Sequence, residues 1–257
     1  MSLSFCTLAS GSKGNAILIK HHDQALLVDC GLSAKELLRR VELAGLAAHQ
    51  IKAIWVTHEH RDHAVGVGVA ARRLGCPVYA SQKTWGGMEN LAKVRHRAFT
   101  VGESLELAGM VLHPFSTSHD AADPAGLVVE AGGQKLGLAT DLGQPTALVR
   151  QRLAGARALI VESNHDPRML TEGPYPPYLQ QRVRGRLGHL SNQQGAELLA
   201  ELCHPGLAHV VLAHLSETNN TPVLAEASAG ASLDQNGFRG RLYVAGQNVP
   251  GPLIRLE

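Results

Sequence analysis

Short apolar runs that stop at a polar residue or a glycine recur along the whole chain, and they predict β-strands. Such runs are dense in the first half and return in the second, with helical patterns between them. The expected strands are residues 16–19, 25–29, 53–57, 77–80, 110–115, 126–131, 135–140, 158–163, 209–214, 240–246 and 252–257.

Three stretches show the spacing of helices instead. Residues 33–45 begin with a capping box formed by Ser33 and Glu36 and end at a glycine. Residues 65–75 are expected to form a second helix, weakened by Gly66 and Gly68, and residues 191–203 a third, with Ser191 as its cap. The segment 167–190 is expected to be a functional loop with a short helix. Strands that alternate with helices, without a visible linker, predict a layered α/β sandwich and one domain over residues 1–257.

Composition excludes several classes of protein. Hydrophobic residues at 44% and charged residues at 18% exclude a disordered chain. A formal net charge of +2 is not that of a non-specific DNA coat, although it leaves room for a local basic groove. Aromatic residues at 4% argue against a broad base-stacking platform.

The four cysteines are far apart and form no pair with metal-ligand spacing, which argues against a thiolate zinc site and against a disulfide framework. The first residues do not resemble a signal peptide, and no apolar run approaches the ~18 residues of a membrane span. We therefore expect a cytoplasmic protein without a membrane partner.

Candidate chemistry centres on the segment 57–63, THEHRDH, which directly follows an apolar strand. Because alternate side chains of an extended segment face the same way, His58 and His60 can point at one metal ion. Asp62 and His63 follow as the chain turns into the next helix, and they can point at a second ion. Two ions ~3.5–4 Å apart stabilise both the attacking and the leaving oxygen of a displacement.

Further candidate ligands follow other strands: His119, Asp141 and His214, with Asp29 placed similarly. A histidine-rich surface loop is the alternative interpretation of the motif. A lone His119 or His214 is more often a capping or core residue, and a lone Asp141 an ordinary turn residue. Their combined order and spacing favour the metal site.

The motif THEHRDH resembles the most specific motif of the metallo-β-lactamase fold superfamily. Segments that resemble its other motifs follow in the expected order: 26–31 (LLVDCG), 116–119 (STSH), 138–141 (LATD) and 210–216 (VVLAHLS). Within the superfamily the chain is most similar to the bacterial YycJ/WalJ exonuclease group, through residues 10–15, 66–81, 188–192 and 213–220.

This resemblance implies a four-layer αββα sandwich with two divalent metal ions. It implies that one ion is held by His58, His60 and His119, that the other is held by Asp62, His63 and His214, and that Asp141 bridges them. The absence of a cysteine ligand separates the chain from zinc β-lactamases, and His60 separates it from the oxygen-reducing diiron relatives, which carry glutamate there. Nitrogen and oxygen ligands suit zinc or manganese, with iron as a further option.

The expected chemistry is hydrolysis by a hydroxide that bridges the two ions, because bound metals lower the pKa of water. Asp62 would orient this nucleophile. His189, just before a predicted helix, would donate to a phosphate or protonate the leaving oxygen. The remaining candidates for substrate binding are Ser12, Asn15, His165, Arg184, Arg186 and Ser191.

The sequence thus predicts a metal-dependent phosphodiesterase acting on nucleic acid, namely a 5′ to 3′ exonuclease on DNA. The DNA substrate follows from the resemblance, with modest support from the arginines before His189. One alternative is a hydrolase of a small cyclic phosphodiester or a thioester that uses the same ions. Another is a non-catalytic nucleic-acid-binding protein. Oligomeric state is left open.

Overall fold

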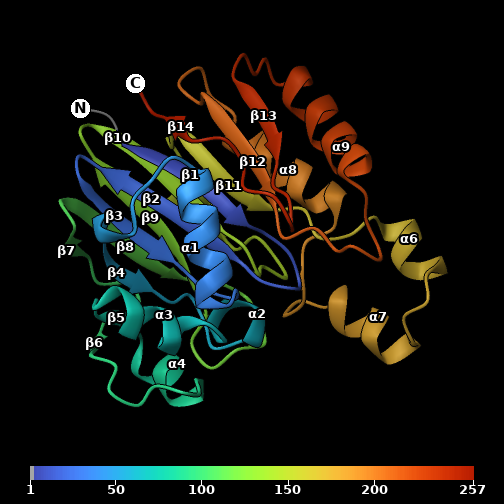
Figure 1. Ribbon diagram of the computed structural model, residues 1–257. Helices are drawn as coiled ribbons and strands as arrows, with labels where there is room; N and C mark the ends of the chain where they lie inside the picture. The colour runs from blue at the N-terminus through green and yellow to red at the C-terminus, as the bar shows by residue number, and fades with distance from the viewer. Residues whose placement is uncertain (1–2) are drawn as a thin grey trace.

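The computed structural model describes residues 3–257 and contains two seven-stranded sheets packed face to face (Figure 1). The first sheet has the order β14-β1-β2-β3-β4-β5-β6. Its strands are β1 (Ser4–Ala9), β2 (Ala16–His21), β3 (Gln24–Val28), β4 (Ile51–Trp55), β5 (Val78–Ala80), β6 (His96–Ala98) and β14 (Ile254–Arg255).

The second sheet has the order β13-β12-β11-β10-β9-β8-β7. Its strands are β7 (Leu105–Leu107), β8 (Met110–Ser116), β9 (Ala125–Ala131), β10 (Gln134–Ala139), β11 (Ala158–Glu162), β12 (His209–Ala213) and β13 (Arg241–Val244). Each sheet is antiparallel on one side and parallel on the other. The parallel pairs run from β3 to β6 in the first sheet and from β10 to β13 in the second.

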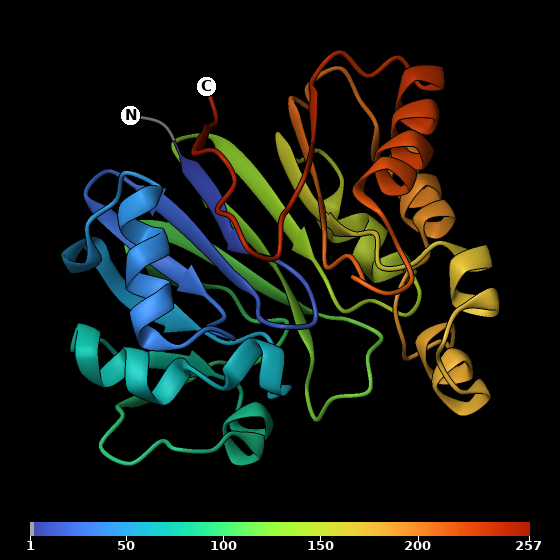
Figure 2. The ribbon, with the colours of Figure 1, turned by 45° about the vertical axis from the view of Figure 1, so that its right-hand side comes forward.

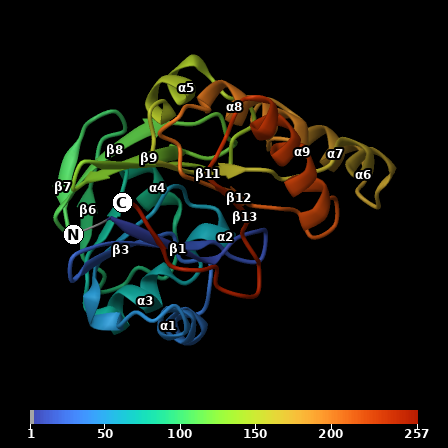
Figure 3. The same cartoon turned by 90° about the horizontal axis from the view of Figure 1, so that it is seen from above.

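Helices cover the outer face of each sheet, as the view from above makes clear (Figure 3). On the first sheet lie α1 (Ala34–Leu43) and α3 (Val67–Leu74), with the short helices η1 (Ala48–Gln50), α2 (Arg61–Ala64) and α4 (Gln82–Gly87) beside them. On the second lie α5 (Ala147–Leu153), α8 (Asn192–Leu202) and α9 (Pro222–Gln235). The predicted four-layer αββα sandwich is therefore confirmed.

Three apolar clusters hold these layers together. The central one lies between the sheets and includes Trp55, Phe5 and Leu127, all without exposed surface. A second lies under α1 and α3, and a third lies under α5, α8 and α9. Burial of this much apolar surface is the dominant favourable contribution to folding.

Two short helices stand apart from the sandwich, α6 (Pro167–Glu172) and α7 (Pro177–Val183) (Figures 1 and 2). α6 buries a single residue, Leu170, and α7 buries none. The segment 167–190 thus contains two short helices, where the sequence predicted one. The sequence pattern also missed β1, β6, β7, α2, α4, α5 and α9. No described helix is long and apolar enough to span a bilayer.

The turn after β3 is bound tightly to α2, which carries part of the THEHRDH motif. Backbone hydrogen bonds run from Cys30 N to His63 O at 2.7 Å and from Gly66 N to Cys30 O at 2.8 Å. A Cβ atom on Gly31 would lie 1.7 Å from the carbonyl oxygen of Asp62. Only glycine therefore allows this approach, which sets the position of α2.

We expect Gly31→Ala to lower the free energy of unfolding by about 1–3 kcal/mol or more, because the added methyl group overpacks a backbone contact. Denaturant titration in the presence of EDTA measures this without a contribution from bound metal. Gly86→Ala is the matched control, since a Cβ there meets no atom within 4 Å. Equal losses in both variants would contradict the role given to this contact.

Candidate metal centre

Five strands place polar side chains at one edge of the sandwich. In the first sheet, β3 and β4 are parallel neighbours, followed by Asp29 and by the segment 57–63. In the second, β10, β11 and β12 are parallel and are followed or ended by Asp141, Glu162 and His214. Because parallel strands end at the same edge, residues far apart in sequence meet there.

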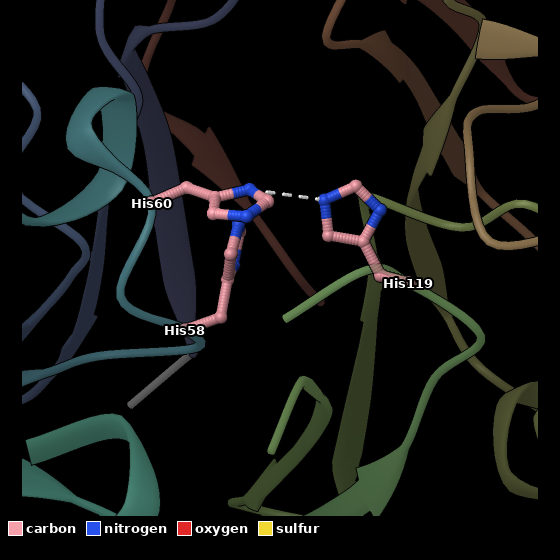
Figure 4. Close-up of side chains that lie close together, drawn as sticks. All are labelled: His58, His60 and His119. Carbon is pink, nitrogen blue, oxygen red and sulfur yellow. Dashed lines mark hydrogen bonds between the residues drawn. The ribbon is translucent and has the colours of Figure 1, made fainter. Parts of the chain in front are cut away.

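The first cluster consists of His58, His60 and His119, whose candidate ligand atoms all lie within 4.8 Å of one another (Figure 4). His58 and His60 come from the loop after β4, and His119 comes from the loop after β8. Nδ1 of His60 lies 3.2 Å from Nε2 of His119. Two ring nitrogens this close, from opposite sheets, have the arrangement expected around a shared cation.

The second cluster consists of Asp62, His63 and His214, again within 4.8 Å. Oδ2 of Asp62 lies 3.3 Å from Nε2 of His214 and 3.4 Å from Nε2 of His63. Asp141 lies between the clusters, because Oδ2 is 3.1 Å from His63 Nε2 and Oδ1 is 3.7 Å from His119 Nε2. The structure thus brings together all seven residues that the sequence analysis named as ligands.

Hydrogen bonds on the far side of the rings determine which nitrogen of each histidine faces the centre. The Thr57 hydroxyl donates to Asp29 Oδ2, so its oxygen is left to accept from Nδ1 of His58, at 3.0 Å. Asp29 Oδ2 also lies 2.8 Å from Nδ1 of His63. Nδ1 of His119 reaches the carbonyl oxygen of Gly188 at 3.1 Å. In each case Nε2 is the nitrogen that is left to face the centre, the pattern that orients metal-binding histidines.

Glu162 does the same for His214, and the sequence analysis missed it. It is fully buried, and Oε1 lies 2.8 Å from Nδ1 of His214 and 2.8 Å from Nδ1 of His189. Oε2 accepts from the backbone N–H groups of Leu142 and Leu190. The available signal was a carboxylate that ends an apolar run, ALIVE, beside the strands that lead to Asp141 and His214.

Three of these residues, Asp29, Asp141 and His214, have φ angles of 61°, 56° and 57°. The left-handed conformation is uncommon for residues other than glycine, and it concentrates at functional sites. Each residue stands just past a buried strand. The sharp turn there directs the side chain across the sheet edge toward the centre, and surrounding hydrogen bonds offset its conformational cost.

Burial and charge act in opposite directions on these groups. Burial would raise the pKa of Glu162, but the charges of and hydrogen bonds from His189 and His214 outweigh it and lower the pKa to about 2. Burial would lower the pKa of His214, but Asp141 and hydrogen bonds to Asp62 and Glu162 raise it to about 10. Burial holds the pKa of His58 well below its usual value. Without a cation, protons on histidine therefore balance the carboxylates.

The arrangement fits a divalent cation. Nε2 of His58 is among the buried polar atoms of the described residues that have no hydrogen-bond partner. Oδ2 of Asp141 is equally buried, and its near neighbour is Nε2 of His63 at 3.1 Å. A cation would satisfy both atoms, and it would replace the protons now held on histidine. The candidate ligand atoms are nitrogen and oxygen atoms. The nearby Cys30 does not act as a thiolate ligand, because its thiol donates a hydrogen bond to Leu32 O and burial raises its pKa to about 12.

A cavity of about 290 Å³ opens onto this centre. Of the residues predicted to act on substrate, it is lined by Ser12, Asp62 and His189. Its outer wall comes from α7 and the loop before it, through Tyr175, Leu179 and Arg182. Arg182 forms an ion pair with Asp120 at 2.7 Å, and this arginine was not among the candidate residues.

Other candidates for substrate binding lie off the wall described for this cavity. Asn15 donates to Asp62 Oδ2 at 3.1 Å and lies 2.9 Å from His63 Nε2, so it contacts the candidate ligands themselves. Ser191 is a helix cap, accepting from Gln194 N. His165 is buried, which lowers its pKa to about 4. Arg184 and Arg186 are exposed beyond the end of α7.

Comparison with known proteins shows the family and the fold. The β-lactamase superfamily domain matches residues 24–215. Exodeoxyribonuclease YycJ of Bacillus anthracis is 38% identical over 242 residues, which covers 93% of this chain and 92% of that protein. Exodeoxyribonuclease WalJ of Streptococcus pneumoniae is 36% identical over 270 residues, covering 100% and 99%. The metallo-β-lactamase fold protein YhfI of Bacillus subtilis superimposes with a TM-score of 0.74 at 17% identity, covering 98% and 99%.

The fold and the His/Asp centre define an enzyme of the metallo-β-lactamase superfamily, a metal-dependent hydrolase of ester bonds. Within that superfamily the chain belongs to the family of YycJ and WalJ.

We expect Glu162→Gln to weaken metal binding by roughly 10- to 100-fold, because loss of a carboxylate behind a ligand histidine typically has that effect. Competition with a chromophoric chelator for Zn²⁺ measures the affinity. Glu130→Gln is the control, since Glu130 is half exposed on β9. Unchanged Zn²⁺ affinity in Glu162→Gln would remove the orienting role assigned to this carboxylate.

Proposed function

We propose that this protein is an exodeoxyribonuclease that removes nucleotides from DNA ends in the 5′ to 3′ direction with two divalent metal ions. The observation that carries the proposal is the convergence of His58, His60 and His119, and of Asp62, His63 and His214, on either side of Asp141 beside one cavity. Similarity to two exodeoxyribonucleases over nearly the full chain supports DNA as the substrate.

In this proposal the two triads each hold one ion, zinc or manganese, and Asp141 contacts both. When bound, the ions act as Lewis acids and lower the pKa of water in the site. Since the ligands come from both sheets, we further propose that residues 1–257 act as a single catalytic domain. A cytoplasmic location agrees with this function and stays a prediction.

The protein's own groups supply the rest of the reaction. Asp62 lines the cavity, and its carboxylate can accept a hydrogen bond from the attacking water, which fixes the direction of attack. His189 also lines the cavity, with Nδ1 held by Glu162 at 2.8 Å. The other ring nitrogen is then free to donate a proton to the leaving oxygen, and the Glu162 carboxylate stabilises the protonated ring.

Basic side chains next to the centre suit a phosphodiester substrate. Arg182 on the cavity wall and Arg184 and Arg186 beyond it carry fixed positive charge. Arginine binds phosphate oxygens in pairs through its planar guanidinium group. Such contacts grip the DNA backbone without reading sequence.

We expect Asp141→Ala to abolish DNA hydrolysis and to reduce the metal content of the purified protein, because the carboxylate lies between both clusters. Arg186→Ala, in contrast, should weaken DNA binding by roughly 2- to 5-fold, as expected for one exposed charge pair. Elemental analysis and single-turnover kinetics measure these effects. Near-normal turnover in Asp141→Ala would contradict the bridging assignment.

A substrate panel tests the activity itself. We expect EDTA to abolish release of nucleotides from end-labelled DNA, and Mn²⁺ or Zn²⁺ to restore it. Labels at the 5′ and the 3′ end distinguish the direction of digestion. Hydrolysis confined to cyclic phosphodiesters or thioesters would overturn the proposed substrate, and DNA binding without cleavage at any metal concentration would overturn catalysis altogether.

A further inference from the structure

The segment 167–190, which contains α6 and α7, contributes little to the core. Leu170 is the one buried residue of its two helices, and both helices lie outside the sandwich (Figure 2). Its last residues are nevertheless bound to the metal centre: Asp120 N donates to Leu187 O at 3.1 Å, and Leu190 N donates to Glu162 at 3.0 Å. A segment with so little apolar burial and such specific attachment points to a role at the cavity.

The inner side of α7 forms the cavity wall opposite the candidate ligands. Tyr175 precedes the helix, and Leu179 and Arg182 lie on it; all three line the cavity. The Arg182 guanidinium is held by Asp120, whose other oxygen lies 3.5 Å from Nε2 of His119. A single residue, Asp120, therefore separates the arginine from the candidate metal ligands, where a phosphodiester would react. A phosphate can compete with Asp120 for its donors.

The outer side of the same segment carries features that packing does not explain. Tyr178 is 74% exposed and Leu187 is 55% exposed. Residues 173–190 contain Arg182, Arg184 and Arg186 and no acidic residue. Aromatic residues are scarce in the chain, yet two of its four tyrosines, Tyr175 and Tyr178, lie within this short stretch. Tyrosines interspersed with arginines are the composition of a surface that binds single-stranded nucleic acid.

The size of the cavity limits what can enter it. Its volume of about 290 Å³ lies just below the range for pockets that hold one small molecule, ~300–1,000 Å³. A single nucleotide is a ligand of that class, whereas a stacked base pair with both backbones is not. The cavity therefore favours a strand that is unpaired at its end.

We propose that the segment 167–190 binds the unpaired end of a DNA strand, with Tyr175 and Tyr178 stacking on its bases and the three arginines neutralising its phosphates. The proposal rests on the proposed nuclease function and specifies its substrate as a strand end with unpaired nucleotides. Arg182 grips the phosphate nearest the centre, and Arg184 and Arg186 grip the backbone outside it.

The test measures DNA binding in EDTA, so that hydrolysis and metal content do not enter. Fluorescence anisotropy compares a short labelled single strand with the blunt duplex of the same sequence. The variants are Tyr178→Ala, Tyr178→Trp and Arg182→Gln. The controls are Val223→Ala, an exposed residue on α9, and Arg73→Gln, an exposed arginine on α3.

We expect Tyr178→Ala to weaken single-strand binding by roughly 5- to 100-fold, the effect of one lost base-stacking contact, and to reduce the preference for single strand over duplex. Tyr178→Trp should restore both, since tryptophan also stacks. Arg182→Gln should lower the slope of log Kd against log salt concentration by about 0.7, the value for one phosphate contact on a single strand. Both controls should bind like the wild type.

Equal losses for single strand and duplex in Tyr178→Ala, or no loss, would overturn the stacking role. An unchanged salt slope in Arg182→Gln would overturn the phosphate contact. The proposed function fails separately, if the wild-type enzyme loaded with metal does not cleave any DNA. A wild type that digests DNA while all the variants bind like it would refute only the role of the segment 167–190.

Discussion

Three buried carboxylates, those of Asp29, Asp141 and Glu162, impose the constraint on which the rest of the site depends. They are 4%, 3% and 0% exposed, and an unpaired charge at such depth would cost several kcal/mol. Each is surrounded by donors, mostly imidazoles and backbone N–H groups. These contacts stabilise the buried charges of the carboxylates. The same contacts also fix the orientation of the histidine rings, and therefore the geometry of the centre.

The topology explains why this concentration of charge occurs at one edge only. Each sheet is antiparallel on one side and parallel on the other, and the parallel strands β3, β4, β10, β11 and β12 all end at that edge. His63 comes from the first half of the chain and His214 from the second, yet both contact Asp62. Neither sheet supplies a complete cluster, because His119 follows β8 of the second sheet whereas His58, His60, Asp62 and His63 follow β4 of the first. Formation of the site is therefore coupled to packing of the two sheets.

The sequence was most informative where local pattern and tertiary position coincide. Apolar strands with polar ends predicted most strands and the ligand candidates, because the same residue that ends a strand turns toward the edge. The role of Glu162 was not predicted, because it depends on the neighbouring strand that leads to His214, and no local pattern reveals that neighbour. The 14-residue helix α9, rich in alanine, escaped because its apolar residues form no distinct stripe. Asn15 and Ser191 were named as candidates for substrate binding, because their actual partners in space could not be inferred from sequence.

The cavity combines two parts with different energetics. Its floor consists of buried residues fixed by hydrogen bonds and by the sheets, so substitutions there affect charge balance, ring orientation and folding together. Its outer wall belongs to the segment 167–190, in which residues 173–187 include no buried residue. The segment is attached through Arg182 to Asp120 and through backbone contacts near Glu162. Because changes in the wall cost little folding free energy, its charge and aromatic content can differ without disturbing the centre. The physical basis of substrate preference is therefore expected in this wall, while the basis of hydrolysis lies in the floor.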